Sequence, residues 1–266
     1  MIKKGNILLV IVIVAMLSSC SKYQKILNDS SDAGAKFNSA VGYYENGQFY
    51  KALRLFEDLR SRFRGTPRDE QLNYYIANCY YQERDYVLGS HYFNKFAKDF
   101  PKSENAEEAK YMSAYCYYLD SPRTSLDQNT TMEAIKEFQV FIDLYPNSKR
   151  IPECNDLLDK LREKLEGKDY DNAYLFYKIG DYQASVIALQ NVLEDYPETS
   201  KREEILYTIL KARYTYASKS IENKQKERYE LPKTAYEEFV KNFPESQYLK
   251  EANNIYQKAL SNLEIN

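Results

Sequence analysis

The residues that could carry catalysis are few and do not come together in the sequence. The single histidine, His91, directly follows Ser90 in a predicted helix, where adjacent side chains point in different directions, so the two cannot form a nucleophile and its general base. The segment 42–47 has the glycine spacing of a phosphate-binding loop, but Gln48 and Phe49 stand where that motif requires lysine and a hydroxyl residue. We therefore expect no catalytic residues, no cofactor and no enzymatic activity.

Three of the four cysteines could bind a metal only with partners that the sequence lacks. Cys79, Cys116 and Cys154 show no Cys-x-x-Cys spacing, and one histidine is too few to complete a zinc site. An odd number of thiols also cannot pair completely as disulfides in an oxidising compartment. We expect these three residues to be small packing residues with free thiols, and we expect no bound metal.

The fourth cysteine, Cys20, ends a segment that is typical of bacterial export. Lys3 and Lys4 precede the apolar run Ile7–Leu17, which is shorter than the roughly 20 residues that a membrane-spanning helix needs. Two small residues stand just before Cys20, so the segment resembles the lipobox of bacterial lipoproteins. The resemblance implies a signal peptide over residues 1–19, palmitate or a similar lipid on Cys20, and a lipid-anchored linker over residues 20–32.

Composition limits the kinds of partner. With 44% hydrophobic and 29% charged residues, the chain has the composition of a folded protein and not of a disordered one. Its net charge is -2, and removing the two lysines of the signal segment makes the charge more negative, so the chain lacks the positive field that attracts nucleic acids. The unusual feature is the presence of 27 tyrosines with no tryptophan. We therefore expect no nucleic-acid binding and look to the tyrosines for function.

An aromatic and alanine pattern recurs along the chain at a fixed period. Phe37, Ala40 and Tyr44 return 37 residues later, return again after another 37, and return once more after 59 because residues are inserted in between. The later copies are Tyr74, Ala77 and Tyr81, then Tyr111, Ala114 and Tyr118, and finally Tyr170, Ala173 and Tyr177. Spacings of three and four place these residues on one helical face, and a second amphipathic segment follows each copy.

Proline and hydroxyl residues mark where each unit ends. Phe100-Pro101 is followed by Ser103, and the same order of aromatic, proline and hydroxyl recurs with Ser148, Thr199 and Ser246. Proline ends a helix, and the hydroxyl residue can cap the next helix by accepting hydrogen bonds from its free N–H groups. Residues 66–69 and 200–203 also have the pattern of a capping box. Each unit is therefore predicted to be a helix, a tight turn, a second helix and a stop.

This unit resembles the tetratricopeptide repeat in its small residue, its aromatic positions and its final proline. The second copy fits with Ala77, Tyr80, Tyr86, Phe93 and Pro101. The resemblance implies an all-α fold, namely a right-handed superhelical solenoid of five tetratricopeptide repeats over residues 33–266 that ends in a C-terminal capping helix near residues 247–263.

Two departures from the repeat length predict special elements. About eight extra residues within Ser121–Asn129 enlarge the turn of the third repeat. The helix that follows the third repeat is lengthened, and one of its sides carries Leu157, Leu158, Leu161 and Leu165. Insertions of this kind often mark a partner surface in solenoid proteins, so we predict the same here.

The order of these features is similar to that of the BamD family, the lipoproteins of the machinery that assembles β-barrels in the bacterial outer membrane. The lipobox, the repeats and especially the stretch from Met132 to Thr199 carry the resemblance. It implies a scaffold at the periplasmic face of the outer membrane that binds C-terminal segments of outer-membrane β-barrel proteins and docks a BamA-like barrel-forming subunit. The alternative is another envelope tetratricopeptide lipoprotein that organises cell-wall or division factors.

The resemblance also points to docking residues near the turn of the fourth repeat. Tyr177, Asp181 and Tyr182 surround this Gly-x-Tyr turn and are the implied contacts with the barrel-forming subunit. The family often has an arginine in the next helix that helps to hold this partner. Ala188 stands at the matching position here, so that particular ion pair is in doubt.

A groove for substrate peptides is predicted on the first helix of each N-terminal repeat. In tetratricopeptide folds the aromatic positions i, i+4 and i+7 of that helix face the concave groove, as the resemblance implies. A tyrosine ring buries a large area and keeps a polar tip for peptide groups, which suits an extended peptide. The alternative is that these rings fill the interior. The predicted groove residues are Phe37, Tyr44, Tyr74, Tyr81, Tyr111, Tyr115 and Tyr118.

Overall fold

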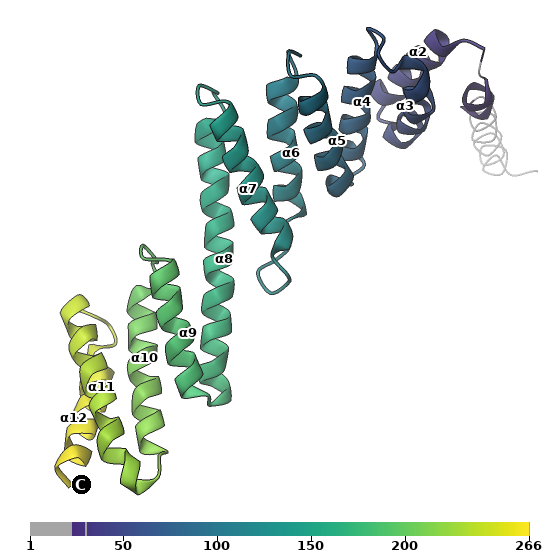
Figure 1. The fold of residues 1–266 in the computed structure, drawn as a ribbon. Coiled ribbons are helices and arrows are strands. Elements are labelled where there is room, and N and C mark those ends of the chain that lie inside the picture. The colour runs from purple at the N-terminus through teal and green to yellow at the C-terminus, as the bar shows by residue number, and fades with distance from the viewer. Residues whose placement is uncertain (1–22, 30, 266) are drawn as a thin grey trace, which may run out of the picture. The chain divides into compact units, whose positions relative to one another are not determined.

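The chain is helical throughout the part that the structure describes. The computed structural model describes residues 23–29 and 31–265, so the predictions for the signal peptide and Cys20 lie outside the described residues. Within that part there are helices and no strands, as predicted (Figure 1). The helices are α2 (Ala33–Glu45), α3 (Phe49–Phe63), α4 (Asp69–Gln82), α5 (Tyr86–Asp99), α6 (Ala106–Asp120), α7 (Asn129–Leu144), α8 (Ile151–Ile179), α9 (Tyr182–Asp195), α10 (Arg202–Ser218), α11 (Glu222–Asn242) and α12 (Leu249–Ile265).

The chain divides into two compact units, and the long helix α8 contributes residues to both. Unit 1 comprises residues 1–122 and 127–161, and its described part contains the helix pairs α2–α3, α4–α5 and α6–α7. Unit 2 comprises residues 123–126 and 162–266 and contains the end of α8 together with α9 to α12. Consecutive helices pack on one another within each unit, for example α5 on α6 and α10 on α11. This succession of packed helix pairs is the arrangement that the repeat pattern predicts.

Part of the predicted linker instead belongs to unit 1. Residues 23–28 are helical, and the ring of Tyr23 lies 5.5 Å from that of Tyr43 in an edge-to-face arrangement. The Lys36 ammonium donates a hydrogen bond to the carbonyl of Leu27 at 2.6 Å and forms an ion pair with Asp58. The linker prediction overlooked this segment because it is too short to show a helical period.

In three repeats, those of α2–α3, α4–α5 and α8–α9, the tight turn between the two helices contains one residue with positive φ. That residue is Gly47 with φ 71°, Arg84 with φ 61° or Gly180 with φ 89°, and only glycine adopts such angles without steric cost. After Arg84 and after Gly180, an aspartate caps the second helix. The Asp85 carboxylate accepts a hydrogen bond from the Leu88 N–H, and the Asp181 carboxylate accepts one from the Ala184 N–H. The segment around Gly47 is therefore a tight turn between two helices and not a phosphate-binding loop, as the sequence predicts.

At three of the four stop prolines, the hydroxyl that follows makes two hydrogen bonds, whereas Ser246, within the described residues, only accepts one from the Tyr248 N–H. Ser103, Ser148 and Thr199 each accept a hydrogen bond at 3.1 Å from the backbone N–H two residues later, which belongs to the residue just before the next helix. Among the residues that the structure describes, no side chain caps the start of α6 or α10, so the predicted capping role is wrong there, and the hydroxyl instead fixes the turn that leads into the helix. Each of the three hydroxyls also donates a hydrogen bond at 2.6 Å to a glutamate on the first helix of the repeat before it. We call this second bond the hydroxyl clamp. Its acceptors are Glu70, Glu107 and Glu166, each four residues before a repeat aromatic.

The two predicted capping boxes are wrong. The Thr66 hydroxyl donates to the carbonyl of Phe63 at 2.7 Å, and the carboxylate of Asp69 accepts from the N–H of Gly65, also at 2.7 Å. The positive φ of Gly65, 74°, turns the chain so that this N–H faces Asp69. In the second predicted capping box, residues 200–203, the Ser200 hydroxyl does not act as the cap. The hydroxyl that accepts a hydrogen bond from the Lys201 N–H is that of Thr199.

The predicted packing role of the cysteines is confirmed. Cys79, Cys116 and Cys154 are fully buried thiols without a disulfide. Burial raises the pKa of both Cys79 and Cys116 to about 12, so these thiols are protonated at neutral pH. Gly89 lies against Cys116, since a Cβ atom there would be only 3.2 Å from the Cys116 Sγ. The small size of both residues lets α5 approach α6.

The two predicted departures from the repeat length are present. An eight-residue loop, 121–128, joins α6 to α7, and its carbonyl at Leu126 accepts a hydrogen bond from Lys168 on α8. Helix α8 has 29 residues, and Leu157, Leu158 and Leu161 are buried in the core of unit 1. The end of the inserted loop therefore packs on α8 within unit 2.

The hydroxyl clamp at Thr199 predicts a measurable stability effect. We expect Thr199→Val to lower the free energy of unfolding by about 1–2 kcal/mol, because it removes both the bond from the Lys201 N–H and the bond to Glu166. Thr199→Ser keeps the hydroxyl and should stay within about 0.5 kcal/mol of the parent. Urea unfolding followed by circular dichroism measures both values. Equal losses in the two variants would contradict this role of the hydroxyl.

Candidate functional site

The predicted groove aromatics fall into two groups in unit 1. Phe37 and Tyr111 are buried, with 4% and 3% of their surface exposed. The other five, which lie on α2, α4 and α6, are half-buried and reach the protein surface: Tyr44, Tyr74, Tyr81, Tyr115 and Tyr118. Only this second group, which we call the tyrosine row, can meet a ligand without opening the core.

Phe37 is a core residue and not a groove residue. Its ring centroid lies 5.6 Å from that of Phe56, 5.7 Å from that of Phe63 and 6.2 Å from that of Tyr75. The guanidinium of Arg68 covers the ring at 5.5 Å. The first aromatic of the helix is therefore enclosed by α3, by α4 and by the segment between them, which corrects the groove prediction at this position.

Tyr111 is enclosed in a similar way. Its ring packs against Phe138 and Phe141, the Arg150 guanidinium stacks on it at 4.0 Å, and its hydroxyl donates to the Glu153 carboxylate at 2.8 Å. Burial, together with this carboxylate, raises the pKa of Tyr111 far above its ordinary value. The prediction that Tyr111 lines the groove is therefore wrong, because its polar tip already has a partner inside the protein.

The tyrosine row continues from one helix to the next. The ring of Tyr44 lies 5.0 Å from that of Tyr75, and on α6 the ring of Tyr115 is stacked on that of Tyr118 at 5.8 Å. Burial raises the pKa of Tyr81, and the neighbouring Tyr115 raises it further, which links α4 to α6. The hydroxyl group of Tyr81 is therefore neutral at physiological pH and can both donate and accept hydrogen bonds.

A hollow of about 440 Å³ opens beside the tyrosine row at the start of α4. It is large enough for one or two side chains of a ligand. The carboxylate of Glu70 in its lining is already bound by the Ser103 hydroxyl, which leaves aromatic rings and side-chain amides to face a ligand. Such a lining suits an apolar side chain next to peptide groups. Its residues are Pro67, Glu70, Gln71, Tyr74, Tyr75 and Asn105.

Unit 2 contains a second aromatic series that the groove prediction missed. Tyr170, Tyr174 and Tyr177 of α8 are stacked at 5.9 and 5.8 Å. Lysines face these rings, with Lys178 at 4.8 Å from the ring of Tyr174 and Lys211 at 5.5 Å from that of Tyr177. The 59-residue recurrence already carried this signal, because Tyr174 occupies the i+4 position of the same pattern.

The three predicted docking residues have different roles. The rings of Tyr177 and Tyr182 meet edge to face at 5.7 Å and are half-buried. Asp181, in contrast, uses its carboxylate to cap α9 by accepting from the Ala184 N–H at 3.1 Å. Ala188 is partly buried against the core of unit 2 and brings no charge to the surface. The helix cap therefore accounts for an aspartate at position 181 without any contact to a partner protein.

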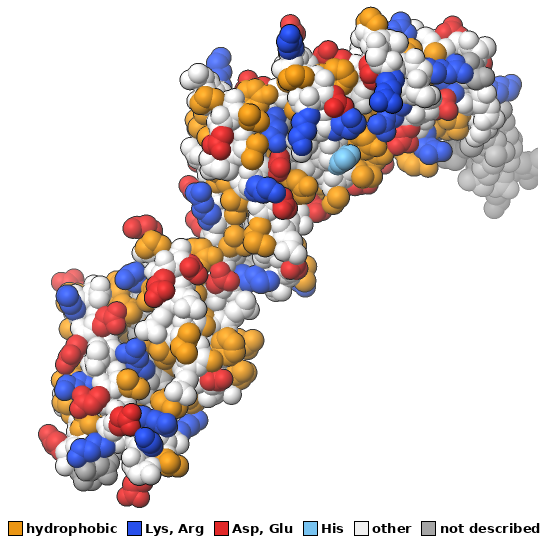
Figure 2. All heavy atoms as spheres, viewed as in Figure 1, with side chains coloured by type: hydrophobic (Ala, Val, Ile, Leu, Met, Phe, Trp, Pro, Cys, Tyr) orange, Lys and Arg blue, Asp and Glu red, His pale blue; other side chains and the backbone are white. Residues whose placement is uncertain are grey.

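Tyr182 lines a small apolar hollow of about 180 Å³ between α9, α10 and α11. Ile187, 61% exposed, forms part of its rim, and hydrophobic side chains are visible on the surface of unit 2 in Figure 2. Arg213 also lines the hollow, and burial lowers the pKa of its guanidinium. The other lining residues are Gln183, Val186, Tyr216 and Leu231.

None of the helices within residues 23–29 and 31–265 is both long and apolar enough to cross a membrane.

Comparison with known proteins identifies relatives over most of the chain. A family model described as YfiO, outer membrane lipoprotein, matches residues 29–231. The outer membrane protein assembly factor BamD of Neisseria meningitidis serogroup B is 23% identical over 263 residues, which cover 92% of this chain and 94% of that protein. BamD of Pasteurella multocida is 24% identical over 182 residues, which cover 64% of this chain and 69% of that protein.

Solved structures with some likeness include the TPR2AB domain of yeast Sti1 in complex with pHSP90. The match covers 87% of this chain and 99% of that chain, with 14% identity and a TM-score of 0.40. A kinesin light chain of Podosopora anserina with TPR-like repeats matches over 78% of this chain and 94% of its own, with 14% identity and a TM-score of 0.33.

The division between core and row tyrosines can be tested by truncation. We expect Tyr111→Ala to lower the free energy of unfolding by about 3–5 kcal/mol, because it opens a cavity and leaves Glu153 without its hydroxyl partner. Tyr115→Ala removes a half-exposed ring and should cost about 1 kcal/mol. Urea unfolding of both variants gives the comparison. If both losses were the same, the assignment of Tyr111 to the core would not hold.

Proposed function

The chain belongs to the YfiO family of outer membrane lipoproteins, and from this premise we propose that it is a non-catalytic scaffold in the assembly of outer-membrane β-barrel proteins. The observation that supports the proposal most directly is the family match over residues 29–231, which includes the whole tyrosine row. Relatives that align over most of the chain are named outer membrane protein assembly factors. The further proposals below concern its substrates, its partner subunit and its anchor.

The tyrosine row is proposed to bind the C-terminal segment of a β-barrel protein. Such a segment is extended and carries aromatic side chains, which can pack on exposed rings. The hollow beside Tyr74 offers space for one of these side chains, and the Gln71 and Asn105 amides can bond to peptide groups. The neutral tyrosine hydroxyls offer further bonds. This combination supports recognition of a peptide by shape and backbone more than by charge.

Unit 2 is proposed to dock a BamA-like barrel-forming subunit at the hollow beside Tyr182. Exposed apolar side chains around a small hollow are typical of protein interfaces. Ile187 at the rim and Tyr182 in the lining offer an apolar contact, and Arg213 offers a charge that is already partly desolvated. A carboxylate from the partner would bind such a guanidinium with little further desolvation of the arginine.

The N-terminal segment is proposed to anchor the protein through lipid on Cys20 at the periplasmic face of the outer membrane. The sequence around Cys20 supports this, as does the family to which the chain belongs. Acyl chains contribute about 0.8 kcal/mol for each buried methylene, so lipidation at one residue can hold the folded units at a membrane surface.

Substitutions in the tyrosine row test peptide binding. We expect the double change Tyr44→Ala and Tyr81→Ala to weaken binding of a fluorescent C-terminal β-barrel peptide by at least about 10-fold, because two contact rings are lost. The double change to phenylalanine keeps the rings and should weaken binding by only about 2- to 5-fold. Fluorescence anisotropy with the detergent-solubilised protein measures both affinities.

The control for this experiment is Tyr50→Ala, which removes an exposed tyrosine of α3 that lies outside the row. It should leave the peptide affinity unchanged. If the alanine pair bound the peptide as tightly as the Tyr50 variant, with circular dichroism spectra like that of the parent, the groove proposal would be refuted.

A charge placed at the rim of the unit 2 hollow tests the docking proposal. We expect Ile187→Lys to abolish co-purification of a barrel-forming subunit from detergent-solubilised membranes, because a lysine cannot enter an apolar contact without losing its hydration. Ile221→Lys is the matched control, since Ile221 is equally exposed in unit 2 but does not line the hollow. Recovery of the subunit with both variants would contradict the docking site, and recovery of cell-wall enzymes without it would favour the alternative function.

A further inference from the structure

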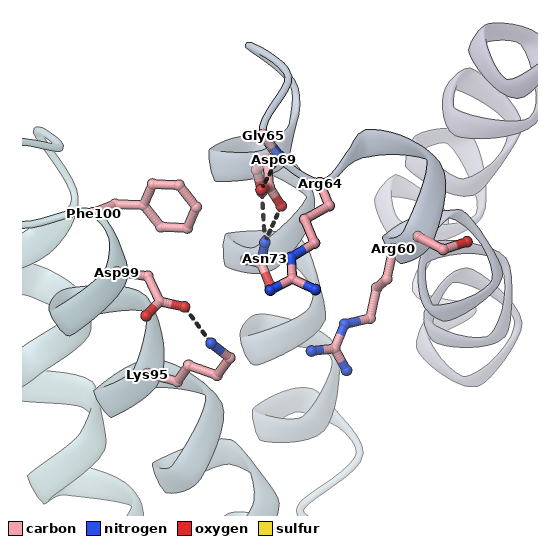
Figure 3. A pocket seen from close by; sticks show the side chains of 9 residues that line it. Arg60, Arg64, Gly65, Asp69, Asn73, Lys95, Asp99 and Phe100 are labelled. Carbon is pink, nitrogen blue, oxygen red and sulfur yellow. Dashed lines mark hydrogen bonds and ion pairs between the residues drawn. The ribbon is translucent and has the colours of Figure 1, made fainter.

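Unit 1 contains a polar pocket that is separate from the tyrosine row. It has a volume of about 720 Å³ and lies where the end of α3, the start of α4 and the end of α5 meet (Figure 3). Arg60 and Arg64 extend into it from the end of α3, whereas Lys95, Asp99 and Phe100 face it from α5 (Figure 3). Nothing in the proposed assembly function uses this pocket.

The acidic groups of the pocket are already bound within the protein. The carboxylate of Asp69 accepts hydrogen bonds from the Gly65 N–H and from the side-chain amide of Asn73, both at 2.7 Å. Asp99 forms an ion pair with Lys95 one turn earlier on the same helix. These contacts fix both carboxylates against the walls and neutralise the one lysine of the pocket.

The two arginines of the pocket have no carboxylate partner among residues 23–29 and 31–265. Arg60 donates to the hydroxyl of Tyr92 at 3.2 Å, and its guanidinium stacks on the Tyr92 ring at 5.3 Å. This stacking holds the guanidinium in place while leaving donors free, since arginine carries five N–H groups. Arg64 is exposed and extends into the same space. The pocket thus presents two arginines without an ion-pair partner in the described part of the chain beside the ring of Phe100, and its charged lining residues, three basic and two acidic, leave it net positive.

We propose that this pocket binds an acidic segment of a partner protein, with side-chain carboxylates on Arg60 and Arg64 and an apolar side chain against Phe100. A planar carboxylate can take two parallel hydrogen bonds from each guanidinium, which makes such pairs specific. The face of unit 1 that shows the single histidine also carries several other basic side chains, which would attract an acidic segment (Figure 2).

A peptide fits the pocket better than a phosphate group does. A phosphate would concentrate two negative charges at one point in the space that Asp69 and Asp99 also line, whereas a peptide carries its carboxylates singly and apart along the chain. Phe100 adds an apolar wall that a free anion would not use. The proposal does not rest on the assembly function and can fail independently of it.

Binding of a defined acidic peptide tests the proposal. The probe is a fluorescein-labelled Asp-Glu-Phe-Glu-Asp peptide with blocked ends, and its neutral counterpart is Asn-Gln-Phe-Gln-Asn. We expect the full chain in detergent to bind the acidic peptide, and the double change Arg60→Gln and Arg64→Gln to weaken this binding by at least about 10-fold in fluorescence anisotropy. The neutral peptide should not bind measurably.

The matched control is the double change Arg54→Gln and Lys98→Gln, which removes two exposed positive charges from α3 and α5 outside the pocket. It should change the affinity by less than about 2-fold. Absence of acidic-peptide binding, equal binding of the neutral peptide, or equal weakening in the two double variants would overturn the proposal. So would arginine-dependent binding of phosphatidylglycerol vesicles without peptide binding, because the occupant would then be a lipid surface.

Discussion

At three junctions between repeats, the position of the next helix depends on a hydrogen bond between the hydroxyl of the stop segment and a glutamate of the preceding repeat. A helix pair of this size cannot bury its apolar face alone, so each repeat is stable only when its neighbour is held at the correct distance. The clamp does this at Ser103, Ser148 and Thr199 with a bond of 2.6 Å in each case. The same oxygen accepts the N–H of the residue just before the next helix, so one atom fixes both the end of a repeat and the turn that leads into the next one.

On α6, though not on α4 where Tyr74 is half-buried, the clamp coincides with the change from buried to surface aromatic residues. Its glutamate stands four positions, about one helical turn, before the first aromatic of the helix, as with Glu107 and Tyr111. The chain segment that carries the hydroxyl and the following helix therefore lie over that ring, and Arg150 and Glu153 cover Tyr111 from there. Tyr115 and Tyr118 lie one and two turns further along α6, where this segment no longer covers the helix, and they reach the surface. Identical residue types at a regular spacing thus receive different roles.

The sequence alone predicted most of the fold but only part of the site. The helix pairs, the long helix α8 and the loop 121–128 follow from periodicity, proline and residue counting, which are local signals. The burial of Phe37 depends on Arg68 and Tyr75, which approach it from another helix, and no spacing within its own helix encodes this. The role of Asp181 is encoded locally, because an aspartate just before the first turn of a helix commonly caps that helix.

The two aromatic series differ in the groups that surround them, and this difference limits what each can bind. In unit 1 the hollow beside Tyr74 is lined by rings and by the amides of Gln71 and Asn105, so an extended apolar peptide loses little hydration on entering it. In unit 2 the lysines at 178 and 211 lie over the tyrosine rings and keep charge at the surface, where burying an apolar strand would cost the hydration of their ammonium groups. One repeated pattern therefore places its tyrosines beside neutral amides in unit 1 and beside lysine ammonium groups in unit 2, because the residues between the tyrosines differ while the tyrosines recur.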